Sequence, residues 1–180
     1  MAGLLNATLY LINTAFLIYI WVLILRVLLQ YFRADPYNPI SQIVGQLTRI
    51  PVGTLQQLIP KWKRLDVAAC LYALFVTWAY LEVVYAFLDQ PLSPLRAALM
   101  SLRELAVQVL NVYSGSLLIY VLLSWFGQGM SNPVGSVLWS INEPLLRPVR
   151  RVFPPYSGLD FSPMVVILAL QVLRILLASA

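Results

Sequence analysis

Four long runs of hydrophobic residues alternate with shorter polar stretches along the 180-residue chain. A helix needs roughly 20 consecutive apolar residues to cross the hydrocarbon of a bilayer. The first of these runs is too long for a cleaved signal peptide, and no Lys or Arg precedes it, so we expect a membrane span there. The pattern therefore predicts four transmembrane helices, over residues 7–32, 67–88, 109–126 and 161–180.

Two polar stretches, residues 33–65 and 127–160, have the pattern of amphipathic connectors between spans. Each contains an Asn-Pro pair followed by apolar residues at i, i+3, i+4 and i+7, the spacing of one face of a short helix. We expect Pro51 and Gly53 to interrupt the first helix and Glu143-Pro144 to end the second. The apolar faces consist of Ile40, Ile43, Val44 and Leu47 in the first connector and of Val134, Val137, Leu138 and Ile141 in the second.

A shift of 94 residues aligns the two halves of the chain without a gap. It matches Asn38-Pro39 with Asn132-Pro133 and Asp66 with Asp160. Two spans in each half give both halves one orientation, unlike the inverted repeats of many transporters. The sequence thus predicts an all-α membrane protein made as a tandem parallel repeat. Its two-span units cover residues 1–92 and 93–180, and the second unit begins with an interfacial segment whose polar side carries Arg96, Arg103 and Glu104.

Positive charge is divided unevenly between the two sides that this topology defines. Cytoplasmic loops of membrane proteins carry an excess of Lys and Arg. Eight basic residues lie in the connectors and three on the opposite side, which predicts cytoplasmic connectors and both termini outside. The eight are Arg33, Arg49, Lys61, Lys63, Arg64, Arg147, Arg150 and Arg151, and the three are Arg96, Arg103 and Arg174.

Composition narrows the class of protein and of chemistry. The chain is 61% hydrophobic and only 11% charged, whereas soluble domains average about 25% charged residues. It has no histidine and one cysteine, Cys70, which excludes a disulfide within one chain and a His/Cys zinc site. We therefore predict no catalytic, cofactor-binding or metal-binding residues. The basic residues that give the net charge of +5 flank the spans, so we expect them to contact anionic lipid headgroups rather than nucleic acid.

Asp66 and Asp160 each precede a span, where a carboxylate caps the first free amides of a helix. The alternative is that each pairs with a basic residue of its own connector and holds that connector to the bundle. Arg147, Arg150 and Arg151 share one side of the second connector, as a site for lipid phosphates or as a docking patch for an acidic partner.

Charged residues inside the spans lie near span ends, where long side chains reach the interface. Glu82 and Arg174 are expected at the same outer level of the membrane. We therefore predict an ion pair or a shared polar site between these two side chains.

The second half resembles the YggT family of small bacterial membrane proteins. The motif runs from Asn132-Pro133 through Glu143-Pro-Leu-Leu-Arg-Pro-Val-Arg-Arg, a Pro-Pro and a Gly-x-Asp to Ser162-Pro163. The first half departs from it, since Gly53, Gln56 and Gln57 stand where Arg147, Arg150 and Arg151 stand. The resemblance implies a bacterial inner-membrane protein with relatives in plastids. It also implies roles in osmotic or ion homeostasis, or in the assembly of membrane complexes and the cell envelope.

Two hypotheses for function remain open. In the first, the protein is a non-enzymatic structural or assembly factor whose basic cytoplasmic face binds lipids and a membrane-protein partner. In the second, it is a small channel or transporter for ions or osmolytes, built as a homo-oligomer and lined by polar residues of the spans. Four spans with few polar residues offer little material for a pore within one chain, which favours the first hypothesis.

Overall fold

A computed structural model describes residues 2–59, 62–125, 132–154 and 160–179. Its described residues form six helices: α1 (Ala2–Tyr31), α2 (Pro39–Leu58), α3 (Val67–Phe87), α4 (Pro94–Trp125), α5 (Pro133–Val152) and α6 (Ser162–Ser179). Helices α1, α3, α4 and α6 are long and apolar enough to cross a membrane. The prediction of an all-helical protein with four spanning helices is confirmed. The division into two equivalent units stays a prediction.

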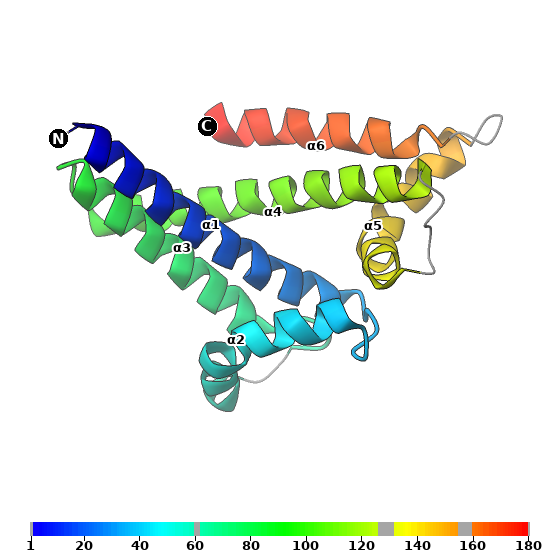
Figure 1. The fold of residues 1–180 in the computed structure, drawn as a ribbon, viewed down its shortest axis with the longest axis horizontal. Helices are drawn as coiled ribbons and strands as arrows, with labels where there is room; N and C mark the ends of the chain where they lie inside the picture. The colour runs from blue at the N-terminus through cyan, green and yellow to red at the C-terminus, as the bar shows by residue number, and fades with distance from the viewer. Residues whose placement is uncertain (1, 60–61, 126–131, 155–159, 180) are drawn as a thin grey trace.

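The four long helices pack as two neighbouring pairs. Figure 1 shows α1 beside α3 and α4 beside α6, with the two pairs crossing at an angle. In the first pair, Ala68, Ala69 and Ala73 of α3 are buried, and such small residues let helix backbones approach closely in a membrane. Helix α6 contacts only α4 and α5 among the described helices, so most of its apolar surface faces outward.

Helices α2 and α5 are the predicted connectors, and their bounds lie 94 residues apart. Each begins after an asparagine whose side chain accepts the backbone N–H two residues later, Asn38 from Ile40 at 2.9 Å and Asn132 from Val134 at 3.0 Å. A proline follows at the first helical position, where its missing N–H costs nothing. Figure 1 places both connectors at the end of the long helices away from the chain termini.

Two sequence predictions about helix ends are wrong. Pro51 does not interrupt the first connector, and Glu143-Pro144 does not end the second, because α2 and α5 continue through these residues. A proline inside a helix removes one hydrogen bond and bends the axis without ending the helix when tertiary packing holds both sides. Val52 and Leu146, which follow these prolines, are fully buried, and Figure 1 shows α2 bending part-way along.

The segment that begins at Pro94 is continuous with the third span. We expected a separate interfacial segment, but Arg96, Arg103 and Glu104 lie on the first turns of α4, which is 32 residues long. At 1.5 Å per residue such a helix is about 48 Å long, so it extends well beyond the hydrocarbon. Parts of several other predictions fall outside the described residues: Lys61, Pro155, Gly158, and residues 126–131 with the predicted span end at Phe126.

Candidate functional site

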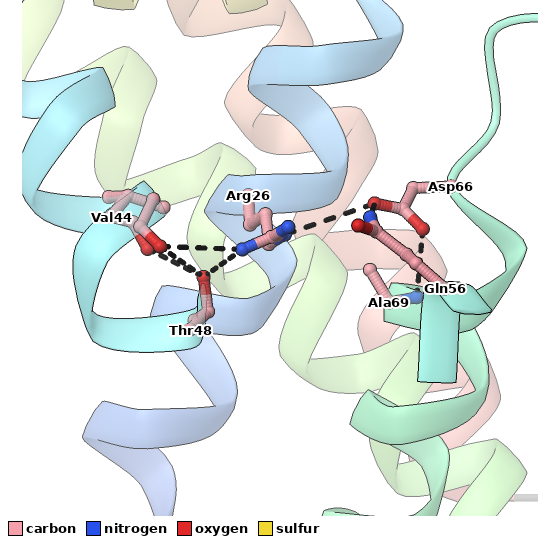
Figure 2. Close-up of polar contacts among 7 residues, drawn as sticks. Arg26, Val44, Thr48, Gln56, Asp66 and Ala69 are labelled. Carbon is pink, nitrogen blue, oxygen red and sulfur yellow. Dashed lines mark hydrogen bonds and ion pairs between the residues drawn. The ribbon is translucent and has the colours of Figure 1, made fainter. Parts of the chain in front are cut away.

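A cluster of four polar side chains joins α1 to the middle and C-terminal part of α2 and to the start of α3 (Figure 2). Its members are Arg26, Thr48, Gln56 and Asp66. Arg26 of α1 donates through Nη1 to Thr48 Oγ1 of α2 at 2.6 Å, and its Nε lies 3.9 Å from Asp66 Oδ2. Gln56 near the end of α2 donates to the same Asp66 oxygen at 2.5 Å. We call these residues the first polar cluster.

The first polar cluster is buried, which makes its charges interdependent. The side chain of Asp66 is fully inaccessible and that of Arg26 is 17% exposed. Asp66 Oδ1 also accepts from Ala69 N at 3.2 Å, so this residue is the N-cap of α3. A buried charge that loses its partner is strongly destabilising. Asp66 therefore ties the start of α3 to α1 and α2, through an arginine of the span rather than of the connector.

A second polar cluster, Glu143, Arg150 and Asp160, holds α5 to the start of α6. Arg150 donates through Nε to Asp160 Oδ2 at 2.8 Å and through Nη1 to Glu143 Oε2 at 2.6 Å. Asp160 Oδ1 accepts from Ser162 N, the first residue of α6, at 2.9 Å. Here the arginine does belong to the connector, and one guanidinium serves two carboxylates.

The electrostatics of the second polar cluster favour the charged forms of both partners. Partial burial alone would lower the pKa of Arg150, but hydrogen bonds to Asp160 and Tyr120 and the two nearby carboxylates raise it above its ordinary value. Burial alone would raise the pKa of Asp160, but the hydrogen bonds from Ser162 and Arg150 lower it. The pair is therefore ionised throughout the neutral range.

The three arginines expected to act as one patch have different surroundings. Arg150 is committed to Glu143 and Asp160 and is mainly a structural residue. Arg147 lies 3.7 Å from Glu143, one helical turn away, but its side chain is 66% exposed. Arg151 is exposed. Only Arg147 and Arg151 therefore present their charge to the outside of the molecule.

The structure does not bring Glu82 and Arg174 together. Glu82 is on α3 and Arg174 is on α6, and these helices do not contact each other within the described residues because α4 lies between them. Arg174 instead donates through Nη1 to Asn111 Oδ1 of α4 at 3.3 Å. The predicted ion pair is replaced by a contact with a neutral side chain on the neighbouring helix.

A line of hydrogen bonds along one face of α4 was not predicted. Trp21 of α1 donates through Nε1 to Gln108 Oε1 at 2.8 Å, and Asn111 Nδ2 donates to the same oxygen at 3.3 Å. Gln108 in turn donates to Glu104 Oε1 at 2.7 Å. The spacing of residues 104, 108 and 111 is i, i+4 and i+7, a signal of one shared helix face that the sequence already carried.

Two further contacts link parts of the chain that are far apart in sequence. Asn38 Nδ2 donates to Pro133 O at 2.8 Å and to Ser136 Oγ at 2.9 Å, so the N-terminal ends of α2 and α5 touch. Arg103 of α4 donates through Nε to Leu177 O at 2.7 Å and through Nη2 to Ala178 O, at the C-terminal end of α6. A cation there complements the negative end of the helix dipole.

The CCB3/YggT family model matches residues 5–88 and 99–180, two segments whose starts lie 94 residues apart. The chain belongs to the CCB3/YggT family. The uncharacterized protein YggT of Escherichia coli K12 is 35% identical over 170 residues, which are 94% of this chain and 88% of that protein. An uncharacterized protein of Pseudomonas aeruginosa is 32% identical over 99% of this chain and 92% of its own length.

A third relative, the Vibrio alginolyticus protein named for the 3′ region of proC, is 35% identical over 97% of this chain and 95% of its own length. No solved structure matches the chain. The comparisons therefore establish family membership over nearly the whole chain.

Proposed function

We propose that this family member is a non-enzymatic structural or assembly factor of the bacterial inner membrane. In this proposal α2 and α5 lie along the cytoplasmic surface, both termini are outside, and the exposed basic residues bind anionic headgroups and a membrane-protein partner. The protein would serve membrane or envelope organisation, or osmotic homeostasis.

The observation that carries the proposal is the way each connector is held. Both α2 and α5 bury one face, and each bonds the aspartate at the start of the following span. Gln56 of α2 donates to Asp66, and Arg150 of α5 donates to Asp160. A connector bonded to the bundle in this way is a rigid platform, because its polar side cannot turn inward without breaking these contacts. On α5 that outer side carries Arg147 and Arg151.

Crosslinking in membranes with a matched control tests this proposal. Arg147→Gln/Arg151→Gln removes the exposed charges but leaves the second polar cluster intact, and Arg96→Gln removes an exposed arginine on the other predicted side. We expect a partner that crosslinks to α5 to be lost in the double variant and retained in the control. A partner retained equally by both variants, with unchanged thermal unfolding, would contradict the role of this surface.

One observation favours the alternative of an oligomeric channel or transporter. Glu104, Gln108, Asn111 and Arg174 place hydrogen-bonding groups between apolar helices. Such groups usually join helices to one another, and here each is bonded to another member of the line. Ion or osmolyte flux through reconstituted liposomes that changes selectivity in Asn111→Ala would favour the channel. The same flux with and without the protein would support the assembly factor.

A further inference from the structure

A cavity of about 430 Å³ lies between the end of α1 and the beginning of α2. Its lining includes three arginines, Arg26, Arg33 and Arg49, together with Gln30 and Ser41. Volumes of this size are typical of sites for small ligands. The lining contains no carboxylate among the described residues, so the cavity is suited to an anion.

Two of these guanidiniums are not neutralised by acidic side chains. Arg26 is partly neutralised by Asp66, because its Nε lies 3.9 Å from Asp66 Oδ2. Arg33 and Arg49, in contrast, have no carboxylate within 4.0 Å in the part of the chain that the structure describes. Asp35, two residues from Arg33, accepts from Tyr37 N at 2.9 Å and does not line the cavity. The cavity therefore holds unbalanced positive charge.

A donor in the same lining is unused. The Oγ of Ser41 is buried and has no hydrogen-bond partner among the described residues. Buried hydroxyls in native proteins nearly always have a partner, and an exception calls for an explanation. A ligand oxygen in the cavity would supply that partner.

Arg33 occupies a backbone position that favours glycine over arginine. Ala34 N bonds to Leu29 O and Arg33 N to Gln30 O, the two hydrogen bonds of a Schellman motif. Arg33 occupies the left-handed position of that motif, with a φ of 55°, where glycine is strongly preferred. Ninety-four residues later the sequence has Gly127. An arginine here accepts a backbone cost that glycine avoids.

The features of this cavity belong to the first half only. The positions 94 residues after Arg26, Arg33 and Arg49 hold Tyr120, Gly127 and Glu143, none of them basic. Gly45, which also lines the cavity, is matched by the bulky Trp139. An added Cβ at Gly45 would meet no atom within 4 Å, so this glycine leaves space open.

We propose that this cavity binds a phosphate-type oxyanion, held by Arg33 and Arg49 with Ser41 as an additional donor. The planar guanidinium can bond two oxygens of one phosphate at once, which suits it to this ligand more than to an isolated halide. The phosphate group belongs to a lipid headgroup or to a soluble phosphate. This site is separate from Arg147 and Arg151, so either proposal can fail while the other holds.

Direct binding to the purified full-length protein in neutral detergent tests the proposal with two probes, inorganic phosphate and short-chain phosphatidylglycerol. Arg33→Gln and Arg49→Gln remove charge, and Gly45→Leu fills the cavity while keeping all three arginines. Gly53→Leu is the matched control, because Gly53 is also on α2, has open space at its Cβ and does not line the cavity. Arg151→Gln controls for general loss of positive charge.

We expect saturable binding of one probe per chain, with the Kd raised about tenfold or more in each cavity variant and unchanged in both controls. Binding of phosphatidylglycerol alone assigns the site to a lipid headgroup, and binding of inorganic phosphate alone or of both probes assigns it to the phosphate group itself. Equal binding by Gly45→Leu, Arg49→Gln and wild type overturns the proposal. Binding of an acidic peptide where both phosphate probes fail also overturns it, in favour of a protein-docking surface.

Discussion

The two polar clusters hold equivalent places in the chain but obtain their arginine from different helices. In the first cluster, Arg26 of the span reaches Asp66, and the connector contributes the neutral Gln56. In the second, Arg150 of the connector reaches Asp160, and the span has Tyr120 at the position of Arg26. What the two halves share is an aspartate at a helix start with a cation beside it, and not the residue that supplies the cation.

The source of the arginine decides which charges remain exposed. In the second half, Glu143 and Asp160 neutralise Arg150, so the charge of this arginine is used in contacts within the protein. In the first half, Arg49 stands where Glu143 stands, and with Arg33 it lines a cavity. The half with fewer matches to the family motif therefore has the more unbalanced positive site.

The largest effect is expected from Asp66→Asn. The amide keeps a capping oxygen but leaves Arg26 buried without a carboxylate, a change that costs about 3–5 kcal/mol in stability. Asp160→Asn is the matched variant, and its cost should be smaller because both members of that pair are about one-quarter exposed. Thermal unfolding in detergent compares them. Equal destabilisation would show that burial does not distinguish the clusters.

A relocated arginine tests whether the cation can come from either helix. Arg26→Tyr alone should destabilise by about 3 kcal/mol, because Asp66 stays buried without its cation. Adding Gln56→Arg copies the arrangement of the second half, and Gln56 already lies 2.5 Å from Asp66. We expect the double variant to recover about half of the loss. A double-mutant cycle measures this coupling, and additive effects would refute it.

The pH dependence of unfolding should reveal how much the second polar cluster contributes to stability. The folded pKa of Asp160 is below that of an unfolded aspartate, near 3.9, because Ser162 and Arg150 bond its charged form. Its contribution to stability is therefore present above about pH 4 and is lost as the pH falls through the folded pKa. Unfolding measured from about pH 7 to 3 should be less pH-dependent in Asp160→Asn. An unchanged profile would mean that Asp160 does not contribute.

The smallest effect concerns the two capping asparagines. Asn38→Asp keeps the cap of α2 but removes the amide that bonds Pro133 O and Ser136 Oγ, at a cost of about 1 kcal/mol. Asn132→Asp keeps the cap of α5 and serves as the control, with an expected change near zero. The difference between the two unfolding midpoints reports the contact between connectors. No difference would indicate that this contact adds nothing to stability.

The prolines inside α2 and α5 show that tertiary packing can override a local rule. The sequence predicts an interruption at Pro51 and a helix end at Pro144, because proline removes a backbone donor. The structure keeps both helices intact, since Val52 and Leu146, which follow these prolines, are buried. Burial of apolar side chains outweighs the loss of one hydrogen bond.

The sequence by itself determined four spanning segments, the buried face of α5 and the aspartate caps. Each of these depends on hydrophobic periodicity or on contacts within a few residues. On α2 only part of the predicted apolar face is buried, because Ile43 and Leu47 are 53% and 58% exposed. Only the tertiary structure decided that Arg26 meets Asp66, that Arg150 serves two carboxylates, that Arg174 meets Asn111 instead of Glu82, and that Arg33 and Arg49 line one cavity. Such partners are chosen by which helices lie side by side, and a long arginine side chain can reach carboxylates on several of them.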